Sequence, residues 1–229
     1  MKGTLLLLAA LALPGLARAH DLWIEPAPAG FAVRHGHRGG ELLPVEAARV
    51  KSARCLVGKG PARDVRAEAT GAATELRISG PCDAVSVFRD GGFWSLTPDG
   101  EVNLPKGEAA QAVRSWASRQ YAKWVDARSA GAGVVLGDEL ELVPASDLSK
   151  ARAGEKITLR VLSAGRPVPD ARVAVGHRAI GETDSKGEVR LRLRAAGVTS
   201  IAASLRRPRP TAEADAEVLE ASLTFEVPR

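Results

Sequence analysis

The chain has 229 residues, 45% of them hydrophobic, which is sufficient for one large globular domain or two small ones. Its 32 basic and 27 acidic residues give a formal net charge of only +5. The one dense basic cluster in the sequence, RRPRP at 206–210, contains two prolines and has no aromatic residue beside it. No nucleic-acid partner is therefore expected.

The N-terminus has the pattern of a cleaved export signal. Lys2 precedes a short apolar run, LLLLAALAL at 5–13, and the small residues of A-R-A at 17–19 form a signal-peptidase site. A membrane-spanning helix needs about 20 apolar residues, so this run is too short to be an anchor. We expect a signal peptide over 1–19, cleavage before His20 and a periplasmic location.

Strand patterns dominate the region that follows, which we expect to form a β-rich N-terminal domain over 20–143. Its short apolar or alternating segments are bounded by Gly and Pro. They are DLWIEP (21–26), GFAVRHG (30–36), VKSARCLVG (50–58), TELRISG (74–80) and DAVSVFRDGGFWSLTPDGEV (83–102). The last segment reads as two strands joined by a hairpin turn at Asp90-Gly91-Gly92.

One stretch of this region departs from the strand pattern. Residues 107–131 place apolar side chains at three- and four-residue steps, which is typical of a helix, so a short helix is expected near 107–118. Beyond it, the sequence also alternates as Arg119, Tyr121, Lys123 and Val125, which leaves a switch to a strand open.

The chain contains two cysteines, Cys55 and Cys82. In an oxidising compartment an even pair predicts a disulfide, and no histidine stands close enough in the sequence to favour a thiolate metal site.

The second half is expected to be a separate module. The segment at 144–147, PASD, has turn chemistry, and from residue 147 onward short strands follow one another at even spacing. This pattern predicts an Ig-like β-sandwich over 147–229. The expected fold is therefore all-β, with two Ig-like sandwich domains.

Histidines supply the most informative chemistry, because imidazole is a good ligand for nickel, cobalt, copper and zinc. After cleavage, His20 would offer its α-amino nitrogen and a ring nitrogen to one ion. His35 and His37 stand at i and i+2, so on a strand their side chains would point the same way. We predict a metal site at these three residues, with Asp21 and Glu25 as further candidates.

Several sequences together resemble one known family. AHDLWIEP at 19–26, GDELELVPASDL at 137–148, AGEKITLRVLSAGRPVPDARVAV at 153–175 and TDSKGEVRLRLRAAG at 183–197 resemble the domain of unknown function 4198 family. That family is also described as NikM-like, a periplasmic component of cobalt and nickel transport. The resemblance implies a nickel or cobalt ion as cargo, and a membrane metal permease or an outer-membrane receptor as partner. It implies no catalytic residues.

Two other functions remain open. The same terminal histidine could bind copper, or the histidines could be incidental to a structural, Ig-like interaction module of the envelope. An enzyme is not expected, because the chain has no G-x-S-x-G nucleophile motif and no complete phosphate-binding loop. The fourth histidine, His177, is expected to lie on a strand of the second sandwich.

Overall fold

The structure, a computed structural model, describes residues 20–176 and 178–228. The predicted signal peptide at 1–19 and His177 lie outside the described residues. Within them the chain is almost entirely β, so the all-β prediction is confirmed. None of the helical segments in this part of the chain has the length and apolar character needed to span a membrane.

The described strands form three sheets, which we name the N-terminal, central and C-terminal sheets. The N-terminal sheet has the order β1-β2-β7-β6, with β3 paired to β2. Its strands are β1 (Asp21–Ala27), β2 (Gly30–Gly36), β3 (Leu42–Leu43), β6 (Glu68–Ala69) and β7 (Glu75–Ser79).

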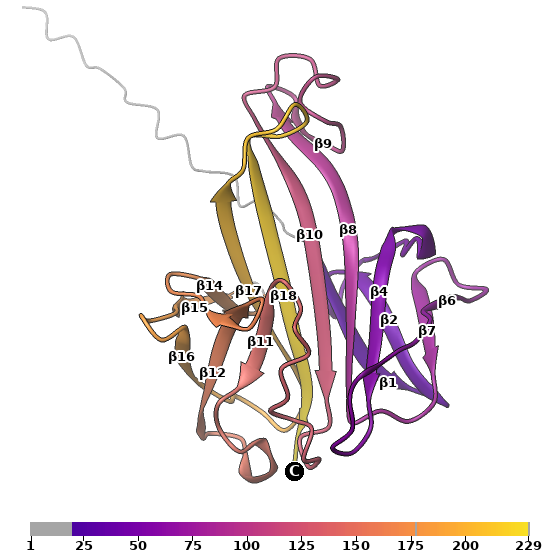
Figure 1. Ribbon diagram of the computed structural model, residues 1–229, viewed down its shortest axis with the longest axis vertical. Helices are drawn as coiled ribbons and strands as arrows, with labels where there is room; N and C mark the ends of the chain where they lie inside the picture. Colours follow the sequence, from indigo (N-terminus) through magenta and orange to yellow (C-terminus); the bar gives the residue numbers. More distant parts are fainter. Residues whose placement is uncertain (1–19, 177, 229) are drawn as a thin grey trace, which may run out of the picture.

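The central sheet has the order β15-β14-β17-β18-β10-β8-β4-β5, with β9 paired to β8. Its strands are β4 (Val50–Leu56), β5 (Arg63–Asp64), β8 (Ala84–Thr97), β9 (Gly100–Val102), β10 (Arg114–Val125), β14 (Arg172–Val175), β15 (Arg178–Glu182), β17 (Gly197–Pro208) and β18 (Ala216–Val227). In Figure 1 the long strands of this sheet run through the middle of the molecule, and their upper ends rise above the smaller sheets.

The C-terminal sheet has the order β11-β12-β13, with β16 paired to β12. Its strands are β11 (Glu141–Pro144), β12 (Lys156–Ser163), β13 (Arg166–Pro167) and β16 (Glu188–Arg192). Two single-turn 3-10 helices, η1 (Ala47–Arg49) and η2 (Leu148–Lys150), complete the described elements.

The smaller sheets pack on opposite faces of the central sheet, which gives two hydrophobic cores. On β10, Tyr121 and Val125 belong to the core shared with the C-terminal sheet, whereas Ala122 and Trp124 belong to the core shared with the N-terminal sheet. Alternate residues of a strand point to opposite faces, so this one strand supplies both cores. The protein is thus built from two sandwiches that share the central sheet.

The two halves of the sequence meet where β10 pairs in parallel with β18, from Trp116 opposite Ala216 to Trp124 opposite Thr224. The two predicted domains, 20–143 and 147–229, therefore both contribute strands to the central sheet. The boundary between them stays a prediction.

The predicted helix near 107–118 is wrong. Residues 107–113 form turns, and β10 begins at Arg114. Both faces of β10 are covered, so apolar residues fall on both sides of the strand, and their spacing imitates the three- and four-residue steps of a helix.

The predicted turn at Asp90-Gly91-Gly92 is also wrong, because these residues lie inside the continuous strand β8. The register between β8 and β10 shifts here, with Gly92 opposite Ser118 and Asp90 opposite Arg119. Gly92 has a φ of 75°, a conformation that glycine adopts readily, and the extra residue forms a β-bulge.

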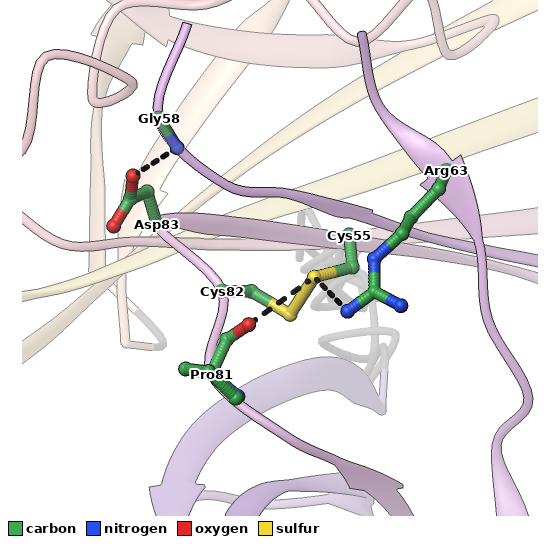
Figure 2. Close-up of a disulfide and its surroundings, with 6 residues drawn as sticks. All are labelled: Cys55, Gly58, Arg63, Pro81, Cys82 and Asp83. Atoms are coloured by element: carbon green, nitrogen blue, oxygen red, sulfur yellow. Dashed lines mark hydrogen bonds between the residues drawn. A yellow bond between two sulfur atoms is a disulfide. The ribbon is translucent and has the colours of Figure 1, made fainter. Parts of the chain in front are cut away.

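The predicted disulfide is confirmed. Cys55 at the end of β4 is joined to Cys82, just before β8, with 5.5 Å between their Cα atoms (Figure 2). Close by, the main-chain nitrogen of Gly58 donates a 2.6 Å hydrogen bond to the Asp83 carboxylate (Figure 2). The bridge therefore ties two neighbouring strands of the central sheet at one end.

Candidate metal-binding site

The pairing of β1 with β2 brings His20 and His37 together. The two strands are antiparallel, and Asp21 lies opposite Gly36. His20 precedes Asp21 and His37 follows Gly36, so the two histidines face each other at the open end of this hairpin. Their ring centroids lie 4.8 Å apart.

His35 joins them from within the sheet. It pairs with Leu22 on β1 and with Leu43 on β3, and its ring centroid lies 5.8 Å from that of His20. The structure therefore brings together the three histidines predicted as ligands, with the His20 ring against each of the other two.

Burial keeps the His35 ring uncharged. The residue is only 8% exposed, and within the described part of the chain its Nδ1 atom is buried without a hydrogen-bond partner. Burial, and then the charge of Arg89, lowers the pKa of His35 to about 3. The pKa of His20 is also lowered, first by burial and then by His37. Neutral imidazole is the form that binds metal ions.

A glycine holds His37 in place. Gly36 has a φ of 127°, and a Cβ atom there would lie 2.4 Å from the main-chain oxygen of Glu41. The main-chain nitrogen of His37 donates a 2.8 Å hydrogen bond to that same oxygen. The close approach of the two backbones thus requires glycine between His35 and His37.

Gln120, on β10, fixes the main chain of His20. Its Nε2 atom donates hydrogen bonds to the His20 carbonyl at 3.0 Å and to the Glu220 carboxylate at 3.2 Å. Its Oε1 atom accepts a 2.6 Å hydrogen bond from Nη1 of Arg89. The side chain is buried, so the end of β1 is fixed to the central sheet by a polar group inside the protein.

Gln120, Arg89 and Glu220 were missed by the reasoning from sequence. Each is a polar residue within a long strand whose neighbours are mostly buried. A polar residue in such a strand indicates an unusual buried polar group. It does not indicate that β8, β10 and β18 lie next to the hairpin of β1 and β2.

Glu25, by contrast, is engaged elsewhere. Its carboxylate forms a 3.0 Å ion pair with Arg34 and accepts a 3.3 Å hydrogen bond from Nε1 of Trp23. It is therefore a poor candidate for a ligand beside His20.

Whether these residues can hold a metal ion depends on whether the α-amine of His20 is counted as a ligand beside the side chains. In residues 20–176 and 178–228, no group of three or more His, Cys, Asp or Glu side chains has the geometry to hold an ion. Imidazole donors nevertheless gather here, and the buried Nδ1 of His35 lacks a partner. The α-amine that cleavage before His20 would create is a further nitrogen donor, and it belongs to none of those side chains. A nitrogen-rich donor set of this kind suits a transition metal.

The model of the domain of unknown function DUF4198 matches residues 17–207. The chain belongs to this family. An uncharacterized protein of Haemophilus influenzae is 29% identical over 176 residues, which cover 75% of this chain and 74% of that protein. No solved structure matches the chain.

Proposed function

We propose that this DUF4198 protein is a periplasmic protein that binds a divalent transition metal and assists the uptake of nickel or cobalt. Cleavage before His20 would leave that residue with a free α-amine and an imidazole, and His35 and His37 would supply the remaining nitrogen ligands. The ion would be handed to a membrane permease or received from an outer-membrane receptor.

One observation carries the proposal. The first residue of the predicted mature chain lies against two other histidines that are 15 and 17 positions away in the sequence, because of the register between β1 and β2. The disulfide between Cys55 and Cys82 supports export, since such bridges form and persist in oxidising compartments.

The proposal is tested by calorimetry on the exported, processed protein. We expect Ni(II) and Co(II) to bind with one ion per chain, and His35→Asn and His37→Asn to weaken binding at least about tenfold, or about 1.4 kcal/mol. His177→Asn is the matched control and is expected to keep the wild-type affinity. Failure of Ni(II), Co(II), Cu(II) and Zn(II) to bind would favour a structural envelope module instead.

A copper protein is the second candidate, because a chelate of amine and imidazole nitrogens also suits Cu(II). Copper is expected to bind more tightly than nickel in vitro whatever the cell supplies, following the general order of divalent metal affinities. The metal content of the protein isolated from the periplasm therefore distinguishes the two: nickel or cobalt supports uptake of those ions, and copper supports the alternative.

A further inference from the structure

A pocket of about 640 Å³ opens beside the histidines. It is lined at one end by His20 and His35, and it continues along β8 and β10 over Arg89, Trp94 and Trp116. Its volume is in the range of about 300–1,000 Å³ that is typical of small-molecule sites. We name it the tryptophan pocket.

A buried cation lines this pocket. Arg89 is 8% exposed, and one of its nitrogens, Nη1, donates to Gln120. Its Nε atom is buried without a hydrogen-bond partner, and no acidic side chain of the described residues forms an ion pair with it. Gln120 is a neutral partner, so no ion pair offsets the cost of burying this charge. A carboxylate would be a favourable counter-ion for this guanidinium, because hydrogen bonds between charged groups are stronger than those between neutral ones.

Two aromatic side chains form a wall of the same pocket. Trp94 on β8 lies directly opposite Trp116 on β10, so both rings project from one face of the sheet. The Arg206 guanidinium lies 5.7 Å from the centre of the Trp116 ring. A flat organic body can pack on these rings while its negative charge faces the arginines.

The acidic residues of the lining do not oppose an anion strongly. Glu46 is paired with Arg49 at 3.1 Å, and Glu182 with Arg172 at 3.7 Å. Burial raises the pKa of Glu220 to about 7, so at neutral pH a large fraction of this carboxyl is uncharged. Glu101 and Asp170, the other acidic residues of the lining, are exposed to solvent.

We propose that the tryptophan pocket binds a small organic carboxylate, with the carboxylate on Arg89 and the body of the molecule on Trp94 and Trp116. We further propose that this molecule is a chelator that arrives with the metal ion, an inference that rests on the proposed function. Within residues 20–176 and 178–228 no group of three or more His, Cys, Asp or Glu side chains has the geometry to hold an ion, so the chelator's donor atoms would complete the coordination sphere. The substrate would then be a metal–carboxylate chelate rather than the bare ion.

The test uses pyridine-2,6-dicarboxylate, a flat, doubly charged chelator, and the processed full-length protein. Its binding without metal is followed by calorimetry and by quenching of tryptophan fluorescence, with the neutral analogue pyridine-2,6-dimethanol as the control ligand. We expect the dicarboxylate to bind, the neutral analogue to bind at least tenfold more weakly, and Ni(II) to tighten dicarboxylate binding.

Arg89→Gln and Trp116→Leu are each expected to weaken dicarboxylate binding at least tenfold, whereas the exposed Arg128→Gln is the matched control and leaves it unchanged. Unfolding curves identify any variant that fails to fold, and either of the two pocket variants suffices for the test. Equal binding of the charged and neutral ligands, or no effect of a folded pocket variant, overturns the carboxylate site.

The two proposals fail separately. Carboxylate binding that depends on Arg89, without any binding of metal, keeps the anion site and rejects both the chelate and the metal-binding function. Binding of Ni(II) to the histidines without binding of the dicarboxylate keeps the proposed function and rejects this inference.

Discussion

His20 and His37 face each other across the open end of the hairpin of β1 and β2, with their ring centroids 4.8 Å apart. The relationship follows from register alone: Asp21 opposite Gly36 places the preceding and following residues opposite one another. A strand slipped by one residue would turn the side chains of β1 to the other face of the sheet. The hairpin therefore determines whether His20 meets the other histidines.

Gly36→Ala tests whether this backbone geometry positions His37. The new methyl group would lie 2.4 Å from the Glu41 oxygen at a φ of 127°, so the chain has to shift. We expect a loss of stability of about 1–3 kcal/mol and at least a tenfold loss of Ni(II) affinity. Denaturant unfolding and calorimetry measure the two effects.

Gly39→Ala is the control for backbone strain alone. Gly39 also has a positive φ, 79°, but a Cβ atom there would have open space around it. We expect a modest loss of stability with unchanged metal affinity. Equal affinity losses in the two variants would show that general strain, rather than the position of His37, controls binding.

The disulfide is expected to contribute substantially to stability. Closing a loop with a sequence separation of 27 residues corresponds, in the chain-entropy model, to about 3–4 kcal/mol. The double variant Cys55→Ala, Cys82→Ala should lose stability of this order in denaturant unfolding. The native protein should show no reactive thiol before reduction, and two reactive thiols in the unreduced protein would contradict the bridge.

Glu220 is expected to make stability depend on pH. Burial raises its pKa from the usual 4.5 to about 7, so between these pH values the folded protein holds more protons than the unfolded chain. This residue's contribution to stability therefore falls as pH rises from 4.5 to 7. Glu220→Gln, which mimics the protonated form, should gain stability relative to wild type at pH 8 compared with pH 5.

The titration of His35 changes stability with pH in the opposite direction and partly masks the effect of Glu220. The pKa of His35 falls from 6.5 to about 3, so the unfolded chain holds more protons between those values and stability rises with pH there. We expect His35→Gln to remove this rise. Unfolding curves of both variants and of wild type across pH 4–8 separate the contributions, and parallel curves would show that neither group is shifted.

The strand segments and the disulfide could be predicted from sequence, because alternation, glycine and proline boundaries and paired cysteines are local signals. The long-range pairing could not. Nothing in the residues of β10 indicates that β18, about a hundred positions later, lies beside it in parallel. The same strand imitated a helix because both of its faces are buried.

The histidines of the candidate site were predictable from their chemistry and from their place after the signal pattern. Arg89 and Gln120 were not, because their role depends on which strand faces the hairpin. A charged or amide side chain inside an apolar strand indicates an unusual buried contact, but the identity of that contact is a property of the assembled sheets.

The central claim is that His20 binds a metal ion through its free amino group as well as its ring. Adding one alanine before His20 in the processed protein converts that amine into an amide, which is a poor metal ligand at neutral pH, and leaves the imidazole intact. Calorimetry with Ni(II) should then show affinity lower by at least about tenfold, or about 1.4 kcal/mol, with an unchanged unfolding curve. Equal affinity of the extended and native forms would contradict the claim.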